Sequence, residues 1–424
     1  MSESKSGTVL IIIGGIGGET TEAKLYYKIF SNLYKNFRIY LLTLYSLSDK
    51  SFIDPTFLIE LNTVRTLSPF RKLRNLSSWL AEVRRIKDRI KPIITFSFAD
   101  PSNFLNVMTK TKTEKIVIRM SGKLSNIAHY QGGSKLYALL YKMFYSLAYR
   151  VYSKKASLIT CVSNDVSYDL SRFGLRGQIV IYNPVDVEYI RTASNETIPE
   201  FFQREPYIVN VGRLTEAKGQ WYLLRIFKFL KLDHPRLKLV IIGDGELKEY
   251  LTNTSRKLGL RTYVWGMNEF TDEYDVYFLG FQRNPFKYMA KAQLFVLTSL
   301  WEGLPTVLLE AMACGTTIVS TDCKSGPREI ISPDTDFRKI ANEVEFSSYG
   351  VLVPPLEVRY KEADEPLDHR ELKLLSTINE LLLNDTLRKN YSSQALRRAE
   401  QFDIHSISES WFKILKERGL LYHG

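Results

Sequence analysis

Two acidic residues stand eight positions apart in the stretch SLWEGLPTVLLEAMACG, residues 299–315, and their spacing suits the binding of a hydroxylated ligand. Pro305 is typical of the first turn of a helix and Gly315 of its end. Glu302 is therefore expected on a loop just before a helix, and Glu310 about midway along that helix. A carboxylate accepts hydrogen bonds from the vicinal hydroxyls of a sugar or ribose. A solvent-facing loop glutamate and a paired helix glutamate would give the same pattern, so that alternative stays open.

The residues between the first acid and the helix contribute donors. Gly303 and Leu304 stand at the expected helix start, where backbone amides have no acceptor within the helix and the helix dipole is positive. These amides are therefore expected to face an anionic or hydroxylated ligand.

Two cations lie five positions apart in VNVGRLTEAKGQ, residues 209–220. A predicted strand leads into Arg213, and Lys218 stands close to the start of the next predicted helix. Arginine offers a planar fork of donors and lysine a compact charge, a combination that suits a diphosphate. Two unrelated basic residues on a solvated loop are the alternative reading of this stretch.

Four glycines follow the first predicted strand in TVLIIIGGIGGETTEAK, residues 8–24. Glycine lets a backbone approach a phosphate closely, and the start of the next helix favours negative charge. The dinucleotide fingerprint would need a glycine where Thr20 stands, and no Gly-Lys-Ser/Thr follows to complete a Walker loop. A nicotinamide-dependent enzyme is therefore disfavoured.

These loops need strands to position them, and short β-branched runs alternate with helical patterns along most of the chain. The expected strands are residues 8–13, 38–44, 93–97, 116–120, 158–162, 178–182, 207–211, 237–242, 294–297, 317–321 and 351–353. Such alternation predicts parallel sheets with helices on both faces. The candidate residues nearly all follow strands, as expected for ligands bound at the carboxyl ends of an open parallel sheet.

The alternation is interrupted once, in a stretch with three prolines and no sustained period, residues 183–206. We therefore expect an α/β protein of two Rossmann-like, doubly wound domains that face a central cleft. The expected boundaries are a first domain at 1–195, a linker at 196–206, a second domain at 207–400 and a C-terminal helix at 401–424 that packs back on the first domain.

Composition and charge narrow the class of protein. Three cysteines in 424 residues give no disulfide framework, which indicates a reducing compartment. No uninterrupted apolar run is long enough to span a bilayer. The net charge of +12 gathers in two segments, residues 65–91 and 135–155, and the second also carries many Tyr and Phe. That pattern suits a helix lying on an anionic membrane, or else an ordinary amphipathic helix whose aromatic residues pack inward. No nucleic-acid recognition motif accompanies the charge.

Taken together and in order, several motifs resemble the family-4 retaining glycosyltransferases of GT-B fold. They are GRLTEAKG, IIGDGELKEYL, LGFQRNP, LFVLTSLWEGLPTVLLEAMACGTTIVSTD and GVLVPP in the second half, with looser matches in GGIGGE, TCVSNDV and YNPVD. The stretch SGPREII resembles members that build bacterial surface polysaccharides and lipid-linked glycans.

The resemblance implies that the first domain binds the acceptor and the second domain the nucleotide sugar. It also implies roles for individual residues. Glu302, with the loop 303–305, would contact the transferred sugar, Glu310 would hold the ribose, and Arg213 and Lys218 would bind the donor diphosphate. The catalytic residues would be Arg213, Lys218 and Glu302. The whole donor-binding set would be Gly17, Gly18, Arg213, Lys218, Glu302, Gly303, Leu304, Pro305, Thr306 and Glu310. Many members carry a histidine just after the strand that corresponds to residues 116–120. Here Ser121 stands at that place, and His129 lies eight residues further on, so both are candidate acceptor-binding or catalytic residues.

The activity implied is a retaining hexosyl transfer from a nucleotide-diphosphate sugar, with UDP or GDP as the nucleotide, to a lipid-linked or surface-polysaccharide saccharide. No cofactor and no metal are expected, since two cations and a helix start already meet the diphosphate. The enzyme would lie in the cytoplasm, peripheral on the anionic inner face of the cytoplasmic membrane. The alternatives are a non-catalytic subunit that binds a sugar nucleotide or a partner, and a GT-B epimerase. Donor base, acceptor, linkage and oligomeric state are not readable from the residues.

Overall fold

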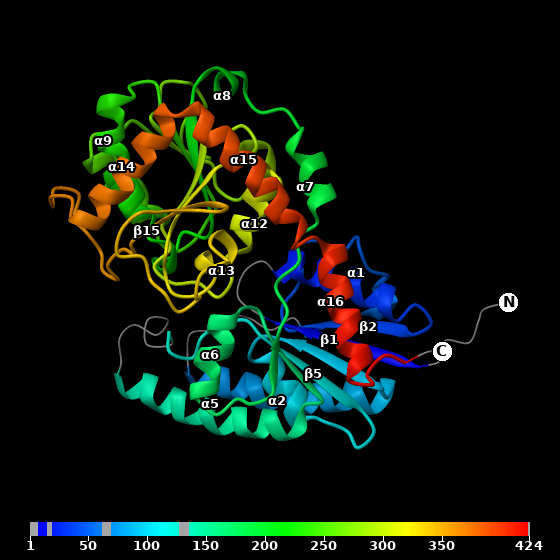
Figure 1. Cartoon of the computed structure of the whole chain (residues 1–424). Helices are drawn as coiled ribbons and strands as arrows, with labels where there is room; N and C mark the ends of the chain where they lie inside the picture. Colours follow the sequence, from blue (N-terminus) through cyan, green and yellow to red (C-terminus); the bar gives the residue numbers. More distant parts are fainter. Residues whose placement is uncertain (1–6, 15–18, 62–68, 127–134, 423–424) are drawn as a thin grey trace. The chain divides into compact units, whose positions relative to one another are not determined.

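The computed structural model describes residues 7–14, 19–61, 69–126 and 135–422 (Figure 1). The chain divides into two compact units, Met1–Asn183 with Ile404–Gly424, and Pro184–Asp403. Each unit is built around one mainly parallel sheet, so the α/β class expected from the alternating pattern is confirmed.

The first unit contains a seven-stranded sheet of order β3-β2-β1-β4-β5-β6-β7, in which every neighbouring pair is parallel. Its elements are β1 (Thr8–Ile13), α1 (Glu19–Leu33), β2 (Arg38–Thr43), η1 (Pro55–Phe57), β3 (Leu58–Glu60), α2 (Pro69–Ile90), β4 (Ile94–Phe98), α3 (Ser102–Met108), β5 (Lys115–Met120), α5 (Lys135–Lys155), β6 (Leu158–Cys161), α6 (Asn164–Arg172), β7 (Gln178–Val180) and α16 (Ile404–Glu417).

Alternate residues of β1 face two different cores, because successive side chains of a strand point to opposite faces of the sheet. Val9 and Ile11 pack with α1 and α16 in one core, whereas Leu10 and Ile12 pack with α2 and α3 in the other. Both faces of β1 are therefore apolar, which explains why its sequence is a continuous apolar run rather than an alternating one.

The C-terminal helix α16 belongs to the first unit, although α15 before it belongs to the second. The ring of Trp411 packs edge-on against Phe30 at 5.3 Å and Phe96 at 6.1 Å, and Trp411 is fully buried. The hydroxyl of Tyr34 donates a hydrogen bond of 2.8 Å to the carbonyl of Leu420. Burial of one apolar helix stripe thus holds the end of the chain on the first unit.

The second unit has an eight-stranded sheet of order β10-β11-β9-β8-β12-β13-β15-β14, parallel except for β14. Its elements are α7 (Val187–Ser194), α8 (Glu200–Arg204), β8 (Tyr207–Val211), η2 (Glu216–Lys218), α9 (Gln220–Asp233), β9 (Lys238–Ile242), α10 (Lys248–Lys257), β10 (Thr262–Val264), β11 (Val276–Phe278), α11 (Phe286–Met289), β12 (Leu294–Leu297), α12 (Thr306–Ala313), β13 (Ile318–Thr321), α13 (Pro327–Ile331), β14 (Glu345–Ser347), β15 (Gly350–Val353), α14 (His369–Leu383) and α15 (Asp385–Glu400).

The division between the units falls after Asn183, whereas the sequence placed the boundary at 195 and a linker at 196–206. Residues 184–206, which include the expected linker, belong to the second unit and contain the helices α7 and α8. Asp186 caps α7 through its side chain, and Val187, Ile190 and Ala193 are buried. Two helices of eight and five residues are too short to show a sustained period, so a turn-rich segment and a short helical one look alike in the sequence.

Candidate functional site

The loops that follow β8 and β12 meet at the carboxyl edge of the second sheet. β8 and β12 are neighbours in the sheet, but the chain proceeds from β8 to β9 on one side and from β12 to β13 on the other. This is the switch point at which open parallel sheets bind their ligands, since the two connections diverge and leave room between them. The loop 212–219 carries Arg213 and Lys218, and the loop 298–305 carries Glu302.

An ion pair joins the two loops. The Nζ of Lys218 donates to Oε1 of Glu302 at 2.5 Å, and both side chains are largely buried. The hydroxyl of Ser299 donates to the same Oε1 at 2.6 Å. Both contacts fall on one carboxylate oxygen, so Oε2 of Glu302 has no hydrogen-bond partner among the described residues and can accept from a ligand hydroxyl. Ser299 was not anticipated from the sequence.

Backbone contacts hold the two loops in register. The amide of Leu300 donates to the carbonyl of Ala217 at 2.7 Å, and the hydroxyl of Thr298 donates to the carbonyl of Lys218 at 2.9 Å. Gly219 has φ +57°, and a Cβ at this position would lie 2.6 Å from the carbonyl oxygen of Thr298. Only glycine therefore permits the close approach that places Lys218 beside Glu302.

The loop after β9 supports the same region from the other side. The sequence predicted only a tight turn at Gly243 and Gly245, but both glycines serve a close approach of two backbones. A Cβ on Gly243 would lie 2.0 Å from the carbonyl oxygen of Gly212, and one on Gly245 would lie 2.5 Å from that of Leu214. The amide of Leu214 also donates to the carbonyl of Asp244 at 3.0 Å.

Arg213 differs from Lys218 because its side chain is exposed. Its guanidinium has no hydrogen bond or ion pair with any residue of the described part of the chain. A cation on a loop that is fixed on both sides, with its donors unused, is available to an anionic ligand.

The start of α12 has the form expected from the sequence. Pro305 occupies the N-cap position, and no side chain caps the helix among the described residues. Leu304 and Pro305 are buried. A Cβ on Gly326 would lie 2.4 Å from Cδ of Pro305, so this turn packs closely against the loop between β13 and α13. The first two amides of α12, those of Thr306 and Val307, thus keep their donors for a ligand.

Glu310 lies in the middle of α12, as expected. Loss of hydration raises the pKa of its carboxyl from 4.5 to about 7, and the charge of Lys218 partly opposes this rise. No described side chain forms a hydrogen bond with this carboxyl. A carboxyl group that is desolvated but not hydrogen-bonded is suited to accept ligand hydroxyls, since these would replace the lost water.

The remaining predicted residues lie in the first unit. Ser121 directly follows β5 at the carboxyl end of that sheet and is half-buried. Gly17, Gly18 and His129 lie outside the described residues. Nothing in the described structure joins Ser121 to a second candidate residue.

Asp100 is a feature of this edge that the sequence did not reveal. It follows β4, and the hydroxyl of Tyr152 donates to its Oδ1 at 2.8 Å. Burial raises the pKa of this carboxyl from 3.8 to about 7. The signal was available in FADPSN, an acid two residues after a strand, but an Asp-Pro pair is also common in plain turns.

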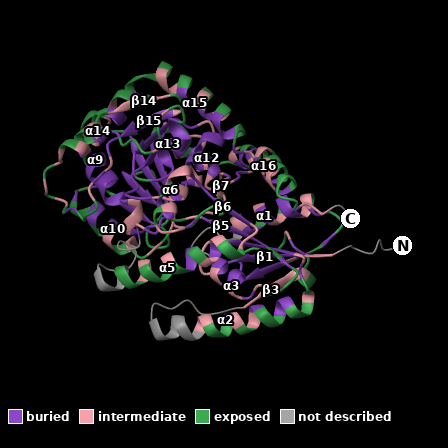
Figure 2. Ribbon diagram, turned by 60° about the horizontal axis from the view of Figure 1, so that its bottom comes forward, coloured by how far each residue is buried: buried purple, intermediate pink, exposed green. Residues whose placement is uncertain are grey.

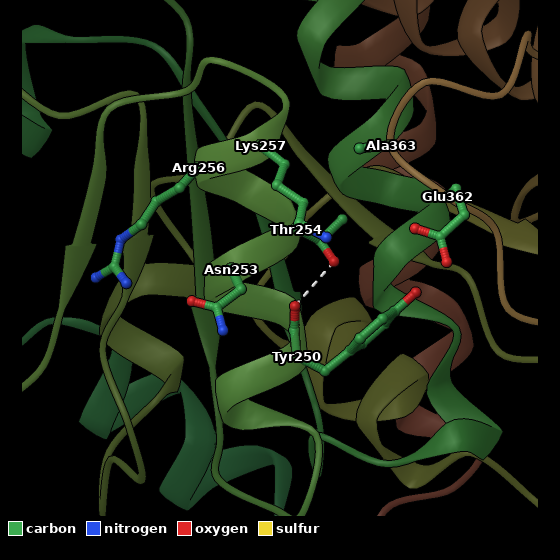
Figure 3. Close-up of a pocket in the computed structure, with 7 residues that line it drawn as sticks. All are labelled: Tyr250, Asn253, Thr254, Arg256, Lys257, Glu362 and Ala363. Carbon is green, nitrogen blue, oxygen red and sulfur yellow. Dashed lines mark hydrogen bonds between the residues drawn. The ribbon is translucent and has the colours of Figure 1, made fainter.

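A surface cavity of about 370 Å³ lies elsewhere on the second unit (Figure 3). It is formed by α10 and the loop 362–363, and Figure 3 shows its labelled side chains spread over both elements. None of the predicted site residues lines it. The convergence of charged groups at the switch point identifies the site better than this cavity does.

The described part of the chain contains no group of three or more His, Cys, Asp or Glu placed to share a metal ion. None of its helices is both long enough and apolar enough to cross a bilayer.

The chain is similar to known proteins over most of its length. The family model "Glycosyl transferases group 1" matches residues 193–337, which include the whole switch-point site. An uncharacterized glycosyltransferase of Methanocaldococcus jannaschii is 35% identical over 66% of this chain and 68% of that protein. The N-acetylgalactosamine-N,N'-diacetylbacillosaminyl-diphospho-undecaprenol 4-alpha-N-acetylgalactosaminyltransferase of Campylobacter jejuni is 33% identical over 56% of this chain and 53% of that protein.

Among solved structures, Anabaena HepE in complex with UDP has a TM-score of 0.67, with 97% of this chain and 100% of that chain covered. Its sequence is 18% identical, so the likeness concerns the fold.

Proposed function

Since this chain belongs to the group 1 glycosyltransferases and has their GT-B fold, we propose that it transfers a sugar from a nucleotide-diphosphate donor to a saccharide acceptor with retention of configuration. The observation that carries the proposal is the Lys218–Glu302 pair at the switch point, with the unused cation of Arg213 on the same loop. A diphosphate needs cations, and a sugar needs acceptors for its hydroxyls; one edge of one sheet supplies both.

The donor would bind with its diphosphate at Arg213, Lys218 and the first amides of α12. Oε2 of Glu302 would accept a hydrogen bond from the transferred sugar, while Glu310 would accept from the ribose. Lys218 has three donor hydrogens, so it can keep Glu302 and still reach a phosphate oxygen. Glu302 thereby positions Lys218 and, through its free oxygen, the sugar.

The chemical step follows from this arrangement. The acceptor oxygen forms a bond to the anomeric carbon on the face from which the phosphate oxygen departs, and the acceptor proton passes to that oxygen. Negative charge grows on the leaving diphosphate, where Arg213 and Lys218 hold it. Lys218 is preorganised by Glu302, and the loop that carries both cations is held by its backbone contacts, so little backbone rearrangement is needed as the charge develops.

The donor and acceptor classes are proposed from the relatives. HepE was solved with UDP, which supports a uridine nucleotide, with GDP as the other candidate. The Campylobacter relative is named for a diphospho-undecaprenol substrate, which supports a lipid-linked acceptor and a peripheral place on the cytoplasmic face of an anionic membrane. No metal and no cofactor is required by this scheme.

A panel of nucleotides and nucleotide sugars, scored by thermal shift, tests the proposal, because a ligand that binds the folded state raises its stability by mass action. We expect one nucleotide-diphosphate sugar to stabilise the protein and to be hydrolysed slowly without acceptor. Binding without any turnover would favour a non-catalytic subunit, and interconversion of the donor sugar would favour an epimerase. If no nucleoside diphosphate stabilises the protein, the proposal fails.

A further inference from the structure

The helix α5 of the first unit presents a row of large apolar side chains to solvent. Leu139, Met143 and Leu147 are 56%, 60% and 63% exposed, and Leu140 and Phe144 beside them are also about half exposed. The spacing of four residues places the first three on one face of the helix. Exposed stretches of α5 are visible in Figure 2. Apolar side chains gathered on one face, rather than scattered singly, mark an interaction surface.

Three tyrosines of α5 do not form this surface. Tyr145, Tyr149 and Tyr152 are buried, and each ring is within 5.7 Å of the next. The sequence left two readings open, a membrane helix with interfacial tyrosines or an amphipathic helix with its aromatics inside. These tyrosines do pack inward, yet the opposite face is apolar from Leu139 to Leu147 instead of polar. An ordinary amphipathic helix would expose charged residues there.

Charge on the exposed face of α5 is separated along its length. The exposed residues from Leu139 to Leu147 are all apolar, and Lys142 among them is half-buried, whereas Arg150, Lys154 and Lys155 are exposed at the other end. No acidic residue occurs in α5. The exposed Arg176 lies at the basic end as well, since its backbone amide donates a hydrogen bond of 2.9 Å to the hydroxyl of Ser153.

We propose that the exposed face of α5 binds an anionic lipid bilayer, with Leu139, Met143 and Leu147 inserted among the acyl chains and the basic end held at the phosphate headgroups. A bilayer surface offers an apolar layer and an anionic layer side by side, which matches the lengthwise separation of the two halves. A second copy of this chain fits this surface less well. Its own α5 would offer apolar and basic residues, but no acidic groups to bind the basic end. The inference stands apart from the transferase proposal, because lipid binding is measured without substrates.

Sedimentation with vesicles of phosphatidylcholine, with and without phosphatidylglycerol, tests the proposal on the full chain. We expect the native protein to bind the anionic vesicles more tightly. Replacing Leu139, Met143 and Leu147 together by Gln should weaken binding at least about tenfold and should do so at high salt as well, since insertion is not screened. Replacing Arg150, Lys154 and Lys155 by Gln should cost roughly fivefold per charge and remove the preference for phosphatidylglycerol.

A matched control exists in the second unit, where Leu232, Leu372 and Leu383 are 75%, 51% and 72% exposed on α9 and α14. Their triple replacement by Gln should leave vesicle binding unchanged. The proposal is overturned if the native protein binds neither vesicle, if the α5 triple variant binds as well as the native protein, or if that variant only converts a dimer to a monomer. Thermal shift with the nucleotide panel should be the same for all variants, so loss of lipid binding is distinguishable from loss of donor binding.

Discussion

The ammonium of Lys218 lies 2.5 Å from Oε1 of Glu302, although the two residues are 84 positions apart in the sequence. The pair joins the loop that contributes cations to the loop that contributes carboxylate, and Ser299 fixes the same oxygen. Each side chain therefore depends on the other for its position and its counter-charge. Removing one partner leaves the other partly desolvated and without an opposite charge beside it. This coupling determines how variants of the site should behave.

Replacement of Lys218 by Ala should lower turnover on the order of 10²–10³-fold, as loss of one preorganised charge partner typically does. Glu302→Ala should also be strongly impaired. The double variant should lose much less than the product of the two single losses, because the residues act as a unit. Steady-state kinetics of the native protein, the two single variants and the double variant measures the coupling free energy between the two residues. Lys228→Ala, at an exposed position outside the site, is the control and should leave the rate unchanged. Fully multiplicative losses would show that the pair acts independently.

Arg213→Ala should lower turnover by a similar factor, about 10²-fold or more, without changing the unfolding temperature. The side chain is exposed and has no partner among the described residues, so the fold gains nothing from it. Arg213→Lys should recover only part of the rate, since an ammonium lacks the planar fork. Kinetics and thermal unfolding of the same preparations check both statements. A large fall in stability would assign Arg213 a structural role instead.

Glu310 should make the stability of the second unit depend on pH. Its folded pKa is raised from 4.5 to about 7, so the folded state favours the protonated carboxyl. The resulting stability is fully present below pH 4.5 and is lost as the pH rises through about 7. Between these values the native protein should lose stability relative to Glu310→Gln, which cannot ionise. Urea unfolding of both proteins without ligand at several pH values measures the difference; parallel curves would contradict the assignment.

Gly243→Ala should be far more damaging than Gly259→Ala, although both glycines have positive φ, +141° and +81°. A Cβ on Gly259 meets nothing within 4 Å, so only the backbone cost of about 1–2 kcal/mol applies. At Gly243 the Cβ would lie 2.0 Å from a backbone oxygen of Gly212, and the cation loop would have to move. We expect loss of turnover as well as stability at Gly243 alone. Equal effects in both variants would remove the close-approach argument.

The buried pair of Lys87 and Glu114 should stabilise the first unit. Their side chains are fully buried, their charged atoms are 2.5 Å apart, and Lys87 also donates to Asn106. Lys87→Met should cost about 3–5 kcal/mol, since it leaves a buried carboxylate uncompensated. Adding Glu114→Gln should restore much of that loss. Denaturant unfolding measures both, and a double variant as unstable as the single one would mean that lost packing, not charge, is the cause.

The α/β architecture and most strands of both sheets could be predicted from the sequence, since continuous apolar runs alternate with helical periods. The short strands β3, β10, β11 and β14 were not anticipated, because three residues carry too little pattern. The division after Asn183 was missed for a related reason: the short helices α7 and α8 resemble a linker until their apolar residues find a core.

The sequence also indicated the groups that we propose to carry the chemistry, namely Arg213, Lys218, Glu302 and Glu310, and that each follows a strand or lies on the helix after it. Tertiary structure decided how they act together. Lys218 reaches Glu302 because β8 and β12 are neighbours, and strand order is set by packing of whole elements rather than by either motif.

The same distinction holds for α5. Its composition showed a basic helix rich in apolar residues, but Tyr and Leu are both apolar enough to face either way. Only the packing of the tyrosines inside the first unit left the leucines outside. Local sequence fixes which side chains a segment can offer, whereas the direction each one faces depends on the surfaces that distant segments bring to it.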